Sequence, residues 1–120
     1  MQKIQPMEKQ KIESVTLTNN GNENIQLDYA ELRKAVIVLR AVNHKLRQQI
    51  IDLLDENDSM AVTDIYVSLR LEQSVASQHL AILRRAGVVD TERQGKYIYY
   101  ALNRERLAQI GKLVEELAAG

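Results

Sequence analysis

At 120 residues the chain is long enough for one domain with a core of its own, which it must build without Trp or Phe. Its 16 basic and 16 acidic residues cancel, which argues against a non-specific polyanion binder but allows a DNA reader with a local basic surface. The lack of cysteine excludes disulfides and thiolate metal sites, and the lack of a long apolar run argues against a membrane partner, so a cytoplasmic protein is expected.

The first 27 residues differ in composition from the rest of the chain. They contain the only proline, Pro6, and a polar tract at residues 19–24. So little apolar surface cannot offset the entropy lost on ordering, and we therefore predict a mobile N-terminal tail over residues 1–27. The alternative is a short edge strand around Ser14–Thr18.

A helical pattern begins at Asp28, which is a good N-cap with Glu31 at the capping-box position. Apolar residues then recur every three or four positions from Tyr29 to Leu39, with Asn43 next in the same register, and a second apolar set, which includes Ile37, lies on other faces. Either this is a central core helix, or it also meets a partner subunit. A second helix is predicted from His44 to Glu56.

The next two predicted helices are joined by a tight turn. A short helix over residues 63–69, with Thr63 as its cap, is followed by a turn at residues 71–73. The longer helix spans residues 73–86 and ends at Gly87, because a glycine past the end and cations in the last turn are typical stop signals. This arrangement is that of a helix-turn-helix motif.

The pattern then changes to period two, which predicts strands over residues 88–93 and 97–102 joined by a glycine turn. Arg93, Gln94 and Lys96 lie at or beside this turn. Such a wing can follow the sugar-phosphate backbone or enter a minor groove, although a solubilising loop tip has the same composition.

A last helix is predicted over residues 103–118, with Asn103 as its N-cap and an apolar seam typical of a coiled coil. The seam consists of Leu107, Ile110, Val114 and Leu117. The predicted fold is therefore mainly α with a β-hairpin wing, a winged helix-turn-helix over residues 28–120 in the order α-α-α-α-β-β-α.

The helix over residues 73–86 separates into two faces on a wheel of about 100° per residue. One face is apolar, and the other carries hydroxyls, amides and arginines without an acidic group. These groups suit base edges and phosphates in a major groove, whereas a polar surface helix is the simpler explanation. The polar face consists of Gln73, Ser74, Ser77, Gln78, Ala81, Arg84 and Arg85.

Both histidines are interpreted as structural. His79 falls within the apolar arc of the same helix, which favours a partly buried ring with a backbone partner over a base contact. His44 lies near a predicted helix start and is interpreted as structural or solvated.

Residues 71–89 and 93–102, which read LEQSVASQHLAILRRAGVV and RQGKYIYYAL, resemble the ArsR/SmtB-type family of bacterial winged-helix repressors. The resemblance implies a homodimer built from the first and last helices. It also implies repression that is relieved by a metal ion or another signal. The residues that it assigns to DNA contact are Gln73, Ser74, Ser77 and Gln78, with Arg93 and Lys96 in the wing.

The chain departs from this family at the metal sites. The positions that correspond to the family's Cys-x-Cys are Ala61, Val62 and Thr63, none of which is a soft ligand, and the last helix has no histidine. We therefore expect no metal and no cofactor. Glu72 also replaces the usual Ser at the N-cap of the longer helix, where Glu caps poorly although its charge suits the helix dipole.

The predicted function is a repressor that binds a double-stranded DNA operator as a homodimer and is not an enzyme, with a small-molecule effector or none. The alternative is a winged-helix protein-interaction module without DNA readout. The predicted DNA-binding residues are Gln73, Ser74, Ser77, Gln78, Arg84, Arg85, Arg93, Gln94 and Lys96. The predicted dimer residues are Leu32, Val36, Leu39, Leu107, Ile110, Val114 and Leu117.

Overall fold

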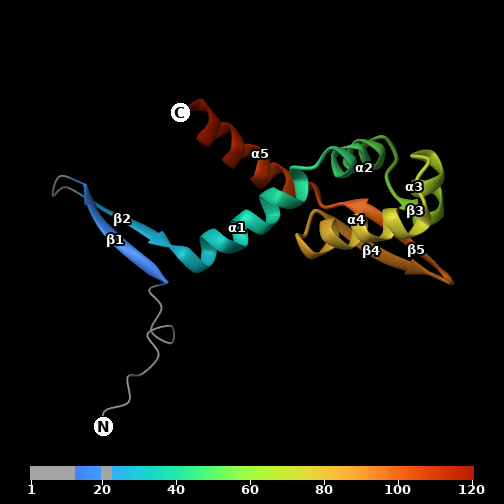
Figure 1. Ribbon diagram of the computed structural model, residues 1–120, viewed down its shortest axis with the longest axis horizontal. Coiled ribbons are helices and arrows are strands. Elements are labelled where there is room, and N and C mark those ends of the chain that lie inside the picture. The colour runs from blue at the N-terminus through green and yellow to red at the C-terminus, as the bar shows by residue number, and fades with distance from the viewer. Residues whose placement is uncertain (1–12, 20–22) are drawn as a thin grey trace, which may run out of the picture. The chain divides into compact units, whose positions relative to one another are not determined.

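The computed structural model describes residues 13–19 and 23–120 of the chain (Figure 1). They form two compact units, one that ends at Val36 and one that begins at Ile37, and α1 belongs to both. The elements in chain order are β1 (Ser14–Asn19), β2 (Glu23–Asp28), α1 (Tyr29–Val42), α2 (Lys45–Glu56), β3 (Met60–Ala61), α3 (Val62–Ser68), α4 (Gln73–Arg85), β4 (Val89–Gln94), β5 (Tyr97–Leu102) and α5 (Arg104–Ala119). Within the described residues, no helix has both the length and the apolar character required to cross a bilayer.

The first unit contains an antiparallel hairpin of β1 and β2. Val15 pairs with Leu27 and Leu17 with Ile25, so all four apolar side chains share one face of the hairpin. Three of them, Leu17, Ile25 and Leu27, remain 43–44 % exposed. The prediction of a tail without regular structure is thus wrong for the paired residues, and the alternative strand at Ser14–Thr18 is correct. The two strands pair the backbone groups that face each other, without a core beneath them.

Residues 1–12 and 20–22 of the predicted tail lie outside the described residues.

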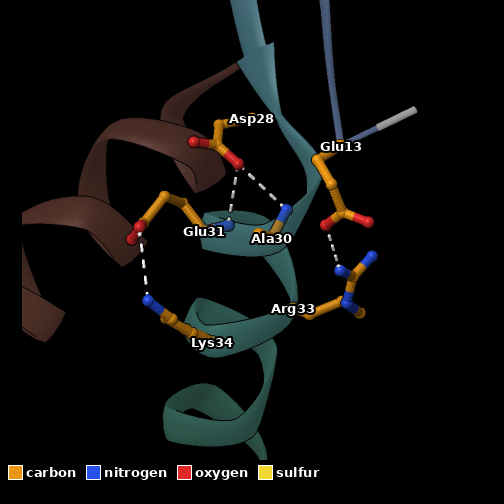
Figure 2. A network of polar contacts seen from close by, with 6 residues as sticks. All are labelled: Glu13, Asp28, Ala30, Glu31, Arg33 and Lys34. Atoms are coloured by element: carbon orange, nitrogen blue, oxygen red, sulfur yellow. Dashed lines mark hydrogen bonds and ion pairs between the residues drawn. The ribbon is translucent and has the colours of Figure 1, made fainter. Parts of the chain in front are cut away.

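The start of α1 is fixed by the predicted N-cap (Figure 2). The Asp28 Oδ1 atom accepts hydrogen bonds from the backbone N–H groups of Ala30 and Glu31, at 3.0 and 3.2 Å. The Glu31 side chain forms an ion pair with Lys34 at 3.4 Å, in place of the capping-box contact predicted for it. A second ion pair of 2.5 Å joins Arg33 of the helix to Glu13, the residue just before β1, so side chains also link α1 to the start of the hairpin.

The second unit has a continuous core between α2, α3, α4 and the start of β4. Half-buried apolar residues from the end of α1, from β5 and from the first turns of α5 pack against it. Burial of these aliphatic side chains stabilises the unit by about 1.5–3 kcal/mol for each large residue. The largest fully buried side chains are Ile50, Leu54, Ile65, Leu80, Leu83, Val88 and Val89.

The wing is part of a three-stranded sheet in the order β3-β5-β4. Gln94 pairs with Tyr97, which leaves Gly95 and Lys96 as a two-residue turn. Gly95 has a φ of +65°, as the first turn residue of a type II′ hairpin requires. The two-residue strand β3 was not predicted, because two residues are too few to show a period.

The helix ends of this unit show which caps the sequence predicted correctly. Asn103 Oδ1 accepts from the Arg106 N–H at 3.0 Å, which confirms this residue as the N-cap of α5. The prediction that Thr63 caps α3 is wrong, because the helix begins at Val62 and its N-cap, Ala61, has no side-chain acceptor.

Gly87 ends α4 as predicted. Its φ is +76°, its N–H donates to the Arg84 carbonyl, and the Val88 N–H donates to the Leu83 carbonyl, both at 2.9 Å. These two bonds are the Schellman motif, which satisfies the last carbonyls of the helix. The chain can therefore turn directly from α4 into β4.

Candidate nucleic-acid interface

The two faces of α4 are separated as the sequence predicts. Ala76, Leu80 and Leu83 are fully buried, and they hold the helix on the core. Every residue of the predicted polar face is exposed: Gln73, Ser74, Ser77, Gln78, Ala81, Arg84 and Arg85. The helix therefore presents hydroxyl, amide and guanidinium groups outward, without a carboxylate.

The exposed face falls into two groups along the helix. Gln73, Ser74, Ser77 and Gln78 lie together on the first two turns, whereas Arg84 and Arg85 belong to the last turn, roughly 15 Å further along the axis. The first group carries amides and hydroxyls, and the second carries guanidinium groups. The structure thus brings four of the six predicted residues on α4 into one cluster.

The N-terminus of α4 has no side-chain cap. Glu72 occupies the N-cap position without a capping hydrogen bond, as the sequence predicts for Glu at this position. The first N–H groups of the helix are consequently open to an external acceptor, and the helix dipole places partial positive charge there. Gln73 and Ser74 lie beside these groups.

The turn before α4 contains an exposed cation that the predicted site omits. Arg70 has a φ of 56°, a left-handed conformation that few residues other than glycine adopt. Its N–H donates to Val67 O at 3.2 Å, and the Leu71 N–H donates to Tyr66 O at 2.9 Å, which closes the end of α3. Its basic character was visible in the sequence, but the turn that exposes it was not.

The wing carries the three remaining predicted residues, all exposed. Arg93 Nε donates to the Gly95 carbonyl at 3.2 Å, and Lys96 Nζ lies 5.7 Å from the centre of the Tyr97 ring. Gln94 donates to the Glu92 carboxylate at 3.3 Å, so the wing, unlike α4, includes an acidic group.

The cations of α4 and of the wing are free of carboxylates within the described residues. The ion pairs found there join Arg33 to Glu13, Lys34 to Glu31 and Arg104 to Asp55. Arg84, Arg85, Arg93 and Lys96 take part in none of them. Their charge is therefore available to an external anion.

His79 lies behind the exposed face and is half-buried, as predicted. Its partner is a side chain and not the predicted backbone group, since Arg47 Nη1 lies 3.1 Å from His79 Nδ1. Burial lowers the pKa of His79, and the nearby His44 and Arg47 lower it further. His44 is structural: its Nδ1 atom accepts from the Leu46 N–H at 3.1 Å and caps α2.

The predicted dimer residues behave in two ways. Leu107 and Ile110 pack against the core of their own chain, whereas Val114 and Leu117 are 47 and 69 % exposed. In α1, Leu32 is exposed, and Val36 and Leu39 are half-buried. The predicted set omits two exposed apolar side chains, Ile37 at 60 % and Leu113 at 38 %.

Across residues 13–19 and 23–120, no three His, Cys, Asp or Glu side chains are close enough together to hold a metal ion. The lack of a metal and of a cofactor stays a prediction.

Comparison with known proteins places this geometry in a family. Residues 44–91 match the family model described as bacterial regulatory protein, arsR family. An HTH-type transcriptional regulator of Methanocaldococcus jannaschii is 38 % identical over 70 % of this chain and 94 % of its own length. The transcriptional repressor PagR of Bacillus anthracis is 33 % identical over 77 % of this chain and 92 % of its own.

Solved structures agree with the sequence matches. HlyU of Vibrio cholerae, a transcriptional activator, is 37 % identical with a TM-score of 0.58 over 71 % of this chain and 92 % of its own. The homodimeric winged helix-turn-helix DNA-binding domain from Mycobacterium bovis is 31 % identical with a TM-score of 0.63, over 75 % of this chain and 82 % of its own. These matches confirm the fold and the resemblance predicted from the sequence. The chain therefore belongs to the arsR family of bacterial regulatory proteins and is a winged helix-turn-helix transcriptional regulator.

Proposed function

We propose that the chain is a homodimeric repressor that reads operator DNA with the first two turns of α4 in the major groove. The observation that carries this proposal is the exposed, acid-free cluster of Gln73, Ser74, Ser77 and Gln78 on a helix whose other face packs on the core. A rigid helix of this kind can enter a major groove, which is about 12 Å wide. Gln can bond adenine in two places, and Ser suits a base edge or a phosphate.

Phosphate contacts would fix the position of this helix on the duplex. The uncapped N-terminus of α4 offers N–H groups to a backbone phosphate. Arg93, Gln94 and Lys96 in the wing, with Arg84 and Arg85 at the far end of α4, supply further donors and charge. Arg70 joins this set, because it is exposed in the turn just before the recognition helix.

The second copy would pack on exposed and half-buried apolar residues of α5 and α1. Leu113, Val114 and Leu117 lie on the last turns of α5, and Ile37 and Leu39 lie in the part of α1 that belongs to the second unit. The homodimeric structure among the similar proteins supports this assembly. In a dimer of this class the two recognition helices lie about 34–36 Å apart, one turn of DNA.

The dimer is tested with Leu117→Asp. Leu117 is 69 % exposed in the single chain, so the substitution should leave the fold intact and bury an unpaired charge only in the dimer. Sedimentation should show a monomer for Leu117→Asp and a dimer for the control Glu116→Ala. An unchanged mass for Leu117→Asp would exclude α5 from the interface.

DNA binding is tested by titration of the protein onto its own promoter region. A dimer that neutralises about six phosphates should lose about a thousandfold in affinity between roughly 50 and 200 mM salt. Gln78→Ala should weaken binding by about 1–3 kcal/mol on this DNA and much less on random DNA, as for a base contact. Gln49→Ala, an exposed amide on α2, is the matched control.

Flat or absent binding by the wild type would favour a protein-interaction module. Equal losses on both DNAs for Gln78→Ala would assign Gln78 to a phosphate.

The proposal also states that the bound dimer represses transcription and that it acts in the cytoplasm. A dimer bound over a promoter blocks polymerase, and in vitro transcription from that promoter should fall as protein is added. Such a protein acts in the cytoplasm, where operator DNA lies. Its proposed role is DNA binding and not catalysis. An increase in transcription would instead indicate an activator, as HlyU is.

A further inference from the structure

One arginine connects three helices of the second unit. Arg47 Nε donates to the Ala41 carbonyl at 2.6 Å, and Arg47 Nη2 donates to the Arg40 carbonyl at 3.2 Å. Its third contact is the 3.1 Å bond from Nη1 to His79 Nδ1. The guanidinium thus extends from the first turn of α2 to the last carbonyls of α1 and to the middle of α4.

The hydrogen bonds of this cluster give both rings the role of acceptor. A guanidinium can only donate, so His79 must accept through an unprotonated Nδ1. His44 Nδ1 also accepts, from the Leu46 N–H, and the two ring centres are 4.9 Å apart. Arg47 is the cation of the group and donates to His79.

The Arg47–His79 bond lies directly behind the face proposed to read DNA. His79 follows Gln78 in the chain and lies within one turn of Ser77, so a shift at His79 moves both side chains. The other end of the link is the C-terminus of α1, the helix whose exposed apolar residues we assign to the dimer. A neighbour provides a contrast: Gln48 donates to the Val42 carbonyl at 2.9 Å and holds the end of α1 without touching α4.

We propose that Arg47 is a positioning residue that, through His79, fixes the direction of the recognition helix relative to the dimer helix α1. This inference rests on the proposed function, because the distance between two recognition helices matters only when both copies bind one duplex. With the link intact, the dimer accepts one spacing of DNA half-sites. Without it, α4 tilts more freely and the dimer tolerates other spacings at the cost of affinity.

The test uses duplexes that carry the promoter segment protected by the wild type, with its half-sites kept or moved apart by one base pair. We expect the wild type to lose about tenfold in affinity on the insertion. Arg47→Lys, which keeps the charge but lacks the planar fork, should bind the native spacing more weakly and lose less than about threefold on the insertion.

Two variants of His79 test the acceptor end of the link. His79→Leu removes the acceptor and should behave like Arg47→Lys. His79→Asn retains an acceptor near the position of Nδ1 and should restore the wild-type spacing preference.

Gln48→Ala is the matched control, since it removes a cap of α1 but leaves the link to α4. A measurement without DNA accompanies the titrations: amide exchange in α4 should be faster in Arg47→Lys and His79→Leu than in Gln48→Ala. Equal losses at every spacing, or unchanged exchange in α4, would overturn the positioning role. Failure of the wild type to bind any of the duplexes would refute the proposed function instead, and the exchange measurement would still test the link.

Discussion

The part of the chain that the structure describes contains two antiparallel hairpins whose strands are equally long, six residues each. Both lead directly into a helix whose first turn is capped by an Asx side chain, Asp28 after β2 and Asn103 after β5. They differ in what lies against them. Val89 of the wing is 1 % exposed, whereas Leu17, Ile25 and Leu27 of the N-terminal hairpin are all more than two-fifths exposed.

This difference shows that strand pairing and stability are separate properties. A two-stranded hairpin alone is only marginally stable in water, and it needs a packed apolar face to resist opening. The wing has such a face, since β4 begins in the core and β5 pairs with β3 on its other side. Its turn can therefore extend into solvent and carry cations, while its base is held by the core.

The largest effect should follow from removing the packing of the wing. Val89→Ala should lower the free energy of unfolding by about 2 kcal/mol, because it deletes two buried methyl groups and leaves a cavity. Ile25→Ala in the other hairpin should change it by less than about 0.5 kcal/mol. Urea unfolding followed by circular dichroism measures both values, and equal values would show that the two hairpins are packed alike.

The next effect concerns the charge at the tip of the wing. Lys96→Ala should weaken DNA binding about equally on operator and random DNA and reduce the salt slope by about two, as for one phosphate contact in each wing of the dimer. Gln26→Ala, on the polar face of β2, is the control and should change neither quantity. Titrations at several salt concentrations decide this, and an unchanged slope for Lys96→Ala would remove the wing tip from the proposed interface.

The same contrast explains which hairpin could be predicted. The wing could be predicted from a glycine at the turn and from adjacent β-branched and aromatic residues in β5. The N-terminal hairpin has only two apolar positions in each strand, Val15 and Leu17 against Ile25 and Leu27, beside a polar tract that suggested disorder. Composition measures how much surface a segment can bury, but not whether two such segments pair.

The site shows a similar division. The exposed face of α4 was predicted correctly, because the helical period of the sequence alone determines which residues share a face. The partner of His79 could not be predicted, since Arg47 is 32 positions away in the sequence and only the packing of α2 against α4 brings the two together. The sequence likewise could not show that the apolar seam of α5 is divided. Leu107 and Ile110, on its first turns, pack against the core of their own chain, whereas Val114 and Leu117 remain exposed.

The turn of the wing gives a smaller effect. Gly95→Ala should lower the free energy of unfolding by about 1 kcal/mol, because alanine resists the left-handed φ of +65°. A Cβ atom there meets nothing within 4 Å, so the cost is conformational and not steric. Gly95→Asn should recover part of the loss, since Asn tolerates this region. An equal loss for Asn and Ala would point to a contact of the turn instead.

The caps that follow the two hairpins should differ in their effect on global stability. Asn103→Ala should cost about 1 kcal/mol in the free energy of unfolding, because it removes the Oδ1 acceptor that caps α5, a helix whose first turns pack against the core. Asp28→Ala removes the same kind of cap from α1, but next to strands with no buried apolar side chain. Its effect should therefore appear as faster amide exchange at Ala30 and Glu31, with the urea midpoint shifted much less than in Asn103→Ala. A urea midpoint lowered as far by Asp28→Ala as by Asn103→Ala would mean that the N-terminal hairpin and the core unfold as one cooperative unit.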